Sequence, residues 1–297
     1  MKTIRLLTIG NSFAENALAY LEAMAQGTGE VRFEVGRANL GGCTLEKHWN
    51  LSLYTGRNPA HKTYRLGTTP DGKPREATLQ EALAAAPWDF VTLQQASPKS
   101  WRRESFQPHL GLLHDLVRRL APGGKVLLHE TWAYRSDSPF LPQNGLTQEL
   151  MFERIRATYE HYAAELGCGV LPSGEAVQRA RRAPGRTFAW PEPDFDYQKA
   201  QVPALPRQAH SLAVGWEWAV NNTPDGVPEL RLDANHLNVR GRYLIGCVWF
   251  ECLTGLDART VAFVPPEIDP ETARFLRETA HEVSRPLGGN GAAGGRA

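Results

Sequence analysis

The sequence predicts an α/β protein built on a parallel sheet of roughly five strands with helices on both faces. Short apolar runs of strand type recur at residues 4–9, 88–93, 125–129 and 169–172, and residues 31–35 alternate between apolar and polar as a strand does. Helical patterns separate them at residues 14–24, 76–86, 106–120 and 146–166, and further ones follow at 174–182 and 243–253. Strands that alternate with helices pair in parallel through right-handed crossovers, and a parallel sheet needs cover on both faces.

The composition is that of a single soluble domain. The chain has 297 residues, 42% hydrophobic and 22% charged, and α/β folds of this length often form one unit. We expect residues 1–287 to form one domain, with a lid or subsite insertion at 183–230. Residues 288–297 are rich in Gly and Ala, and we expect them to be a disordered tail.

The charge balance argues against some classes of binding partner, and the N-terminal sequence bears on the expected location. The net charge is +1, from 33 basic and 32 acidic residues, which indicates no face for nucleic acid or for an anionic membrane. There is no apolar run of about 18 residues and no signal peptide. We therefore expect the chain as written to be cytoplasmic, an expectation that a previously removed leader would change.

Ser12 stands where the first strand turns into the first helix. The strand breaks at Gly10, and the helical pattern begins at Ala14. A hydroxyl at such a turn lies near the free N–H groups of the helix, which favour developing negative charge. This position suits a nucleophile. Serine is also a favoured helix N-cap, and the stretch alone favours capping.

Asp233 and His236 lie three positions apart, just before the helical pattern at 243–253. A nucleophilic serine needs a base, and the base needs a partner that fixes its tautomer and stabilises the imidazolium. If both residues lie on one short loop, a turn can bring them to the same serine. Helix capping by Asp233 or Asn235 explains the stretch equally well.

The order of several motifs resembles the SGNH, or GDSL-type, hydrolase superfamily. The motifs are Gly10-Asn-Ser-Phe, the pair Gly41-Gly42 and Asp233-x-x-His236. They are most similar to a branch catalogued only as a domain of unknown function, in which Gly-Asn-Ser-Phe replaces Gly-Asp-Ser. Segments 93–97, 130–134, 171–176 and 236–244 are also similar to that branch. Each motif is short, so the specificity lies in their combination over roughly residues 3–256.

The resemblance implies a flavodoxin-like, three-layer α/β/α fold and a serine esterase. In this reading Ser12 attacks an acyl carbonyl, His236 is the base and Asp233 orients His236. The resemblance implies no metal and no cofactor.

The resemblance also implies an oxyanion hole. Its donors are the backbone N–H groups of Ser12 and of Gly41 or Gly42, with the side-chain amide of Gln94. Most members of the superfamily have Asn at this strand end, where this chain has Gln94 and Gln95. Strand alternation sends the two side chains to opposite faces. The branch favours Gln94, and the alternative is that these amides tie down the following loop.

Aromatic residues indicate the substrate class. Trp132 and Tyr134 follow the strand at 125–129, and Trp190 and Tyr197 lie in the irregular segment 183–230. Together with Gln95, these side chains are candidate substrate contacts, since aromatic rings offer apolar faces to a sugar or an acyl group. Core packing explains Trp132 and Tyr134 equally well.

The expected substrate is a small-molecule or oligosaccharide ester, most simply a carbohydrate that carries an acetyl group. Two other functions stay open, because a fold does not dictate a function. One is a glycan-binding protein on the same scaffold without turnover, and the other is an acyltransferase. Neither nucleic acid nor membrane is an expected partner, and the sequence indicates no oligomeric state.

Overall fold

Five parallel strands form the central sheet of this computed structural model, which describes residues 1–68, 73–220 and 226–284. The sheet has the order β2-β1-β5-β6-β7, and each neighbouring pair is parallel. The strands are β1 (Lys2–Gly10), β2 (Val31–Asn39), β5 (Phe90–Leu93), β6 (Lys125–His129) and β7 (Gly169–Leu171). The expected parallel sheet of about five strands is confirmed. The expected tail at 288–297 lies outside the described residues.

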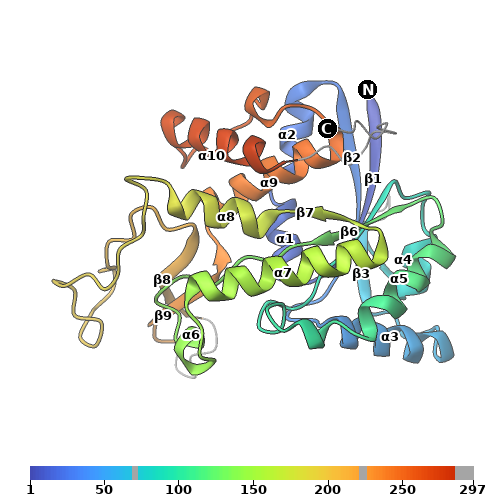
Figure 1. Cartoon of the computed structure of the whole chain (residues 1–297), viewed down its shortest axis with the longest axis horizontal. Helices are drawn as coiled ribbons and strands as arrows, with labels where there is room; N and C mark the ends of the chain where they lie inside the picture. Colours follow the sequence, from blue (N-terminus) through green and yellow to red (C-terminus); the bar gives the residue numbers. More distant parts are fainter. Residues whose placement is uncertain (69–72, 221–225, 285–297) are drawn as a thin grey trace, which may run out of the picture.

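Helices cover both faces of this sheet, which gives the expected three layers (Figure 1). One layer contains α1 (Ser12–Leu18), α2 (Leu21–Thr28) and α9 (Val239–Thr254), with α8 (Ser173–Arg182) and α10 (Pro270–Val283) packed against α9. The other layer contains α3 (Leu45–Arg57), α4 (Leu79–Ala84), α5 (His109–Leu120) and α7 (Gln148–Leu166). The short helix α6 (Phe140–Gln143) lies outside both layers.

Helix α9 is the centre of its layer. Residues 243–253 are all buried, and they are apolar apart from Gly246 and Glu251. A helix that is apolar all round must be covered on all sides, and α9 packs against α1, α2, α8 and α10. This packing fixes the start of α9 relative to the start of α1.

Two features of this layer differ from the expectation. The helical pattern at 14–24 divides into α1 and α2, which are separated by Ala19 and Tyr20. Helix α10 was not expected, although Asp269 caps it by accepting the Thr272 N–H at 2.9 Å and Pro270 is its first residue. Both are sequence signals for a helix start.

Two antiparallel hairpins lie outside the central sheet. One is β3 (Tyr64–Thr68) with β4 (Pro74–Ala77), and the other is β8 (Ala213–Ala219) with β9 (Glu229–Leu237). Residues 183–212, the first part of the expected insertion, contain no helix or strand. Within the described ranges, no helix has both the length and the apolar character that crossing a bilayer requires.

Candidate active site

Ser12, His236 and Asp233 meet beyond the carboxyl end of β1. The Nε2 atom of His236 lies 2.8 Å from the Oγ of Ser12, and its Nδ1 lies 2.9 Å from the Oδ2 of Asp233. Ser12 is partly exposed, and the His236 side chain is 33% exposed. The three side chains therefore form one hydrogen-bonded chain whose serine end is open to a ligand.

Other residues supply the helix caps that could have explained both stretches. Asn11 caps α1, because its Oδ1 accepts the N–H of Phe13 at 3.1 Å. Asn238 caps α9, because its Oδ1 accepts the N–H of Gly241 at 3.1 Å. The Ser12 hydroxyl is therefore free to bond His236.

A bulge in β9 brings Asp233 and His236 to the same side of the strand. In a regular strand, residues three apart point to opposite faces. Here Gly215 pairs with Asp233 and Ala213 pairs with Leu237, so one residue of β8 opposes residues 234–236 of β9. The sequence led us to expect a loop at this point. The pair lies in a strand instead, and the bulge supplies the change of direction.

Hydrogen bonds hold Asp233 in its charged form. Burial raises the pKa of Asp233, but the ring and backbone N–H groups of His236, the charge of His236 and the Asn235 N–H outweigh burial, and the net pKa is lowered. The backbone N–H of His236 donates to Oδ1 at 2.9 Å. A charged Asp233 keeps the ring proton of His236 on Nδ1, which leaves Nε2 as the proton acceptor facing Ser12.

The Gly41-Gly42 turn is bound to the loop that carries Ser12. The Leu40 N–H donates to the carbonyl of Gly10 at 3.0 Å. On the other side of the glycine pair, the Nδ2 of Asn11 donates to the carbonyl of Cys43 at 3.1 Å. These two bonds place the glycine pair beside the start of α1.

Three backbone N–H groups at this turn remain available for a ligand. Among the described residues, nothing accepts a hydrogen bond from the N–H of Ser12, Gly41 or Gly42. Gly42 has a φ of +61°, and a Cβ on either glycine would meet nothing within 4 Å, so both face open space. Free N–H groups beside a nucleophile are what an oxyanion needs.

Gln94 is placed differently from the expectation that its amide donates to an oxyanion. Its Nε2 donates to the Oδ1 of Asn11 at 2.8 Å and to the carbonyl of Gln95 at 3.3 Å, which uses both amide hydrogens. Asn11 Oδ1 also accepts the Phe13 N–H, so it must be an acceptor, and this fixes the orientation of the Gln94 amide. A Cβ on Gly10 would lie 2.7 Å from Gln94 Oε1, so a larger residue there would displace the Gln94 amide. Gln94 therefore supports the loop of the nucleophile.

Gln95 is not a substrate contact in this structure, because it is 1% exposed. Its Oε1 accepts from the N–H groups of Ala96 at 2.8 Å and Leu45 at 3.2 Å, and its Nε2 donates to the carbonyl of Ser105 at 2.8 Å. Gln95 thus ties the start of α3 to the loop that follows β5. This is the alternative that the sequence left open for these amides.

Trp132 and Tyr134 are also buried, contrary to the expectation that they contact a substrate. Trp132 is 0% exposed, and its ring stacks on that of Phe13 at a centroid distance of 3.9 Å. Tyr134 is 7% exposed, and its hydroxyl lies 2.9 Å from the Oγ of Ser97. Core packing, the competing explanation, accounts for both rings.

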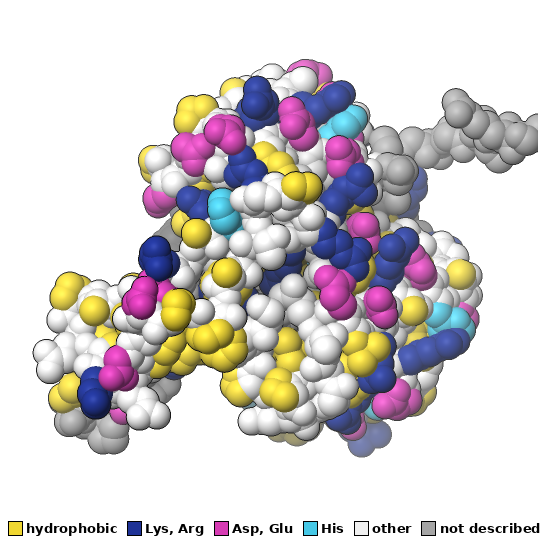
Figure 2. Space-filling model, turned by 60° about the vertical axis from the view of Figure 1, so that its left-hand side comes forward, with side chains coloured by type: hydrophobic (Ala, Val, Ile, Leu, Met, Phe, Trp, Pro, Cys, Tyr) yellow, Lys and Arg dark blue, Asp and Glu magenta, His cyan; other side chains and the backbone are white. Residues whose placement is uncertain are grey.

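Residues 183–220 and 226–230 form a projecting lobe, at the lower left of Figure 2, on which hydrophobic side chains gather. The exposed ones include Trp190, which is 47% exposed, and Val202 and Leu205. Tyr197 is half-buried inside the lobe, where its hydroxyl accepts the Glu192 N–H at 3.2 Å. Of the two expected stacking residues, Trp190 presents its ring to solvent and Tyr197 is only partly accessible.

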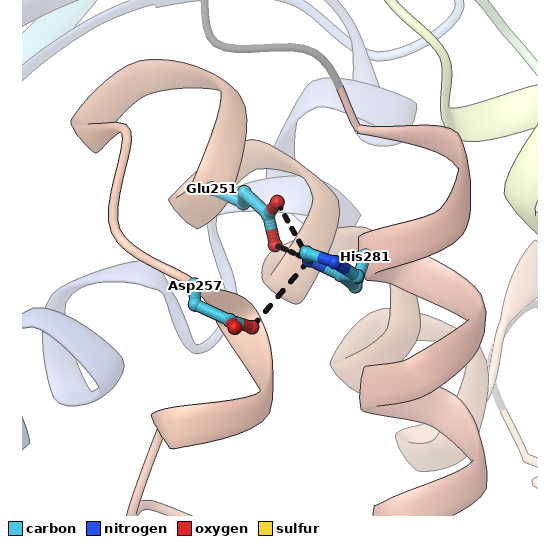
Figure 3. Close-up of side chains that lie close together, drawn as sticks. All are labelled: Glu251, Asp257 and His281. Atoms are coloured by element: carbon cyan, nitrogen blue, oxygen red, sulfur yellow. Dashed lines mark hydrogen bonds and ion pairs between the residues drawn. The ribbon is translucent and has the colours of Figure 1, made fainter.

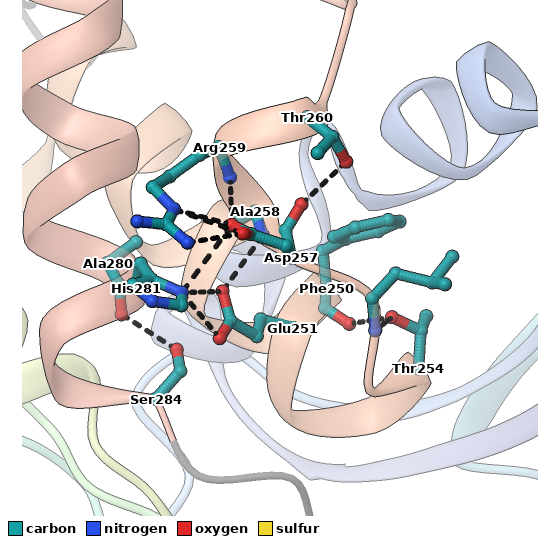
Figure 4. A network of polar contacts seen from close by, with 11 residues as sticks. Phe250, Glu251, Thr254, Asp257, Ala258, Arg259, Thr260, Ala280, His281 and Ser284 are labelled. Atoms are coloured by element: carbon teal, nitrogen blue, oxygen red, sulfur yellow. Dashed lines mark hydrogen bonds and ion pairs between the residues drawn. The ribbon is translucent and has the colours of Figure 1, made fainter.

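A second polar group, Glu251, Asp257 and His281, lies at the ends of α9 and α10 (Figure 3). Within 1–68, 73–220 and 226–284 it is the only group of three side chains that could hold a metal ion. Its oxygens already have donors: Glu251 accepts from the Ala258 N–H at 2.8 Å and from His281 at 2.9 Å. The guanidinium of Arg259 binds Asp257 at 2.6 and 2.9 Å (Figure 4). The group thus fits a structural ion-pair network that fastens α10 to the end of α9.

Comparison with known proteins identifies the family of the chain and a solved structure with a similar overall fold. A model of the family described as "Domain of unknown function (DUF4886)" matches residues 5–188. The crystal structure of a DUF4886 family protein from Bacteroides uniformis is 28% identical, with 95% of this chain and 94% of that chain covered and a TM-score of 0.69. No curated protein matches the chain.

Two lipolytic proteins align less closely. One is a member of the lipolytic protein G-D-S-L family from Veillonella parvula, at 13% identity, 85% and 100% coverage and a TM-score of 0.46. The other is a lipase/acylhydrolase from Enterococcus faecalis, at 12% identity, 61% and 80% coverage and a TM-score of 0.39. The family match at residues 5–188 includes Ser12 but ends before Asp233 and His236.

Proposed function

Because the chain belongs to the DUF4886 family, whose description names no reaction, the chemistry must come from the site, and we propose that the protein is a serine esterase. The observation that carries the proposal is the hydrogen-bonded chain from Ser12 Oγ through the two nitrogens of His236 to the Asp233 carboxylate. A nucleophile, a base and a group that orients the base are the three parts that acyl transfer requires.

In the first half-reaction, Ser12 Oγ attacks the carbonyl carbon of the ester while Nε2 of His236 takes its proton. The carbonyl oxygen becomes an oxyanion, and the N–H groups of Ser12 and of Gly41 or Gly42 are the donors available for it. When the tetrahedral intermediate collapses, the bond to the leaving oxygen breaks. His236 then gives its proton to that oxygen, so the alcohol leaves neutral and Ser12 carries the acyl group.

In the second half-reaction, water replaces the alcohol. Nε2 of His236 removes a proton from the water as the water oxygen attacks the acyl carbon, and the same N–H groups hold the oxyanion. Collapse breaks the bond to Ser12 Oγ, which recovers its proton from His236, and the acid is released. Asp233 stays ionised throughout, and its lowered pKa suits this role.

The substrate that we propose is a carbohydrate that carries a small acyl group such as acetate. The support is the lobe of residues 183–220 and 226–230, where Trp190 is 47% exposed and available to stack on a sugar ring. Exposed carboxylates on the same lobe, at Asp194 and Asp196, can accept hydrogen bonds from sugar hydroxyls. Buried Trp132 and Tyr134 no longer support this proposal.

Hydrolysis of p-nitrophenyl acetate tests the reaction, with Ser12→Ala and His236→Ala as controls. We expect both variants to lose activity and to keep the thermal midpoint of the wild type, because neither side chain belongs to the core. An acetylated oligosaccharide supplied in place of the chromogenic ester tests the substrate class. A Ser12→Ala variant with wild-type turnover would contradict the proposal that Ser12 is the nucleophile of an esterase.

A further inference from the structure

We propose that Trp132 and Asn16 are positioning residues that hold His236 at its working distance from Ser12. The inference rests on the proposed esterase function, because it assigns a role within that site. The strand that carries the base is irregular at this point, because residues 234–236 form the bulge of β9 and lack regular pairing with β8. A base carried on a bulge needs other contacts to keep its place.

Trp132 holds the residue that precedes His236. Its Nε1–H donates to the carbonyl of Asn235 at 2.7 Å. The same ring stacks on Phe13, the residue after Ser12, with centroids 3.9 Å apart and planes within 3° of parallel. The rings of His236 and Phe13 form a T-shaped pair with centroids 5.9 Å apart. One buried side chain therefore contacts both the helix that carries the nucleophile and the strand that carries the base.

Asn16 holds the residue that follows His236. Its Oδ1 accepts the backbone N–H of Leu237 at 2.8 Å, and Asn16 is 7% exposed. Asn16 lies four residues after Ser12 in α1, so the two side chains share one face of the helix. The helix that presents the nucleophile thus also binds the strand that presents the base.

These contacts bracket His236 on both sides along the chain. Its preceding carbonyl is bound from the β6–α6 connection and its following N–H from α1, while Asp233 fixes its ring. Neither Trp132 nor Asn16 is exposed enough to touch a substrate. Their loss should therefore displace the base without changing how the substrate binds, and a displacement of about 1 Å can cost about 10²-fold in rate.

The test uses three variants and one matched control. Trp132→Phe keeps a ring against Phe13 and removes only the N–H. Asn16→Ala removes the acceptor, and Asn16→Asp keeps an acceptor oxygen. Trp88→Phe is the control, because it also removes a buried indole N–H bond, to Ala82 at 3.0 Å, but precedes β5 at the opposite end of the sheet from Ser12.

The first readout is the second-order rate constant of inactivation by a fluorophosphonate, which reacts with Ser12 through the same base and oxyanion donors as an ester. The constants kcat and KM for p-nitrophenyl acetate are measured beside it. We expect Trp132→Phe and Asn16→Ala to slow inactivation and to lower kcat by about 10-fold or more at constant KM. Asn16→Asp should recover most of the rate, and Trp88→Phe should match the wild type. Wild-type rates in both Trp132→Phe and Asn16→Ala would overturn the inference.

The second readout does not depend on turnover. The ¹⁵N resonances of the His236 ring report which nitrogen carries the proton. We expect one tautomer, protonated on Nδ1, in the wild type and in Trp88→Phe, and an averaged pair of signals in Trp132→Phe and Asn16→Ala. If the wild type reacts with neither the ester nor the fluorophosphonate, the esterase proposal fails and these resonances alone decide the positioning role. Unchanged His236 signals in folded Trp132→Phe and Asn16→Ala would then overturn it.

Discussion

The Nε2 of His236 lies 2.8 Å from the Oγ of Ser12, although 224 positions separate the two residues in the chain. Ser12 begins α1, and His236 lies two residues before Asn238, the cap of α9. Because α1 and α9 pack against each other over the same face of the sheet, their starting points lie close together. The contact between nucleophile and base therefore depends on the packing of two helices.

Replacing Asp233 by Asn should lower kcat by up to about 10⁴-fold, because an amide facing Nδ1 favours the wrong tautomer of His236. The new side chain keeps an acceptor oxygen for the N–H groups of Asn235 and His236, which now bond Oδ1 at 3.3 and 2.9 Å. The bulge and the thermal midpoint should therefore be preserved. Steady-state kinetics beside a thermal melt check this prediction, and a folded variant with wild-type kcat would refute it.

Replacing Trp190 and Tyr197 by Ala should reduce kcat/KM for an acetylated oligosaccharide by about 1 kcal/mol or more, roughly fivefold, the scale of a lost aromatic contact. Hydrolysis of p-nitrophenyl acetate should not change, because that small ester reaches only the Ser12 end of the site. The single Trp190→Ala variant is the cleaner probe, since Tyr197 also packs on Phe195 and Trp216 inside the lobe. Equal losses on both substrates would show that the lobe supports the triad and does not bind the sugar.

Replacing Glu130 by Gln should stabilise the protein at neutral and alkaline pH. Burial raises the pKa of Glu130 to about 8; the Glu175 N–H and Arg156 lower it, while the charges of Glu175 and Glu160 raise it. The unfolded chain releases this proton near pH 4.5 and the folded chain near pH 8, so wild-type stability falls as the pH rises between these values. A glutamine mimics the protonated acid and does not titrate.

Urea unfolding of both proteins between pH 4 and pH 9 measures this difference. The free energies of unfolding should differ by a pH-independent amount below about pH 4.5. Above that pH the difference should grow in favour of Glu130→Gln, by up to a few kcal/mol, until about pH 8. A difference that stays constant over the whole range would show that Glu130 is ionised in the folded protein.

His48 should make the wild type less stable in mild acid. Burial lowers the pKa of His48 to about 4, although its bond to the Gly10 carbonyl raises it, and the charge of Lys47 lowers it further. Because the ring donates from Nε2 to Gly10 at 3.0 Å, its Nδ1 accepts from the Tyr64 hydroxyl at 2.8 Å. The unfolded chain binds a proton near pH 6.5 and the folded chain only near pH 4, so stability is lost as the pH falls between them.

A His48→Gln variant separates this titration from the loss of the hydrogen bonds. It should be less stable than the wild type at pH 7.5, because the Tyr64 hydroxyl or the Gly10 carbonyl loses its present partner. Urea midpoints should then converge as the pH falls from 6.5 toward 4, since only the wild type loses stability through residue 48. Parallel curves over that interval would contradict a neutral His48.

The sheet could be predicted because each of its strands is either a short apolar run or, at 31–35, an alternating apolar and polar pattern, and helical patterns separate the strands. The site could be predicted only through the resemblance, since the Ser12 stretch alone favours a helix cap and the Asp233 stretch alone fits a helix cap equally well. What the sequence could not show are the partners of particular atoms. The two amide hydrogens of Gln94 are used by Asn11 and Gln95, which no pattern of residue types reveals.

The bulge in β9 and the roles of Trp132 and Asn16 have the same cause. All three depend on how separate segments meet in space. The bulge depends on how β8 pairs with β9 within one hairpin. The two roles depend on contacts between segments more than a hundred residues apart: Trp132 with Asn235, and Asn16 with Leu237. Asn16 lies four residues after Ser12 in α1, but no pattern in the sequence singled it out. Trp132 was visible as an aromatic at the edge of the sheet, but its burial was not.

The covalent acyl-enzyme tests the central claim most directly. Wild-type protein is mixed with excess p-nitrophenyl acetate, quenched in acid during turnover, digested and analysed by mass spectrometry. We predict one acetyl group, on Ser12, that disappears as the substrate is exhausted and is absent from Ser12→Ala. Steady hydrolysis with no acetyl group on Ser12, or an equal yield of adduct elsewhere in Ser12→Ala, would contradict the assignment of Ser12 as the nucleophile.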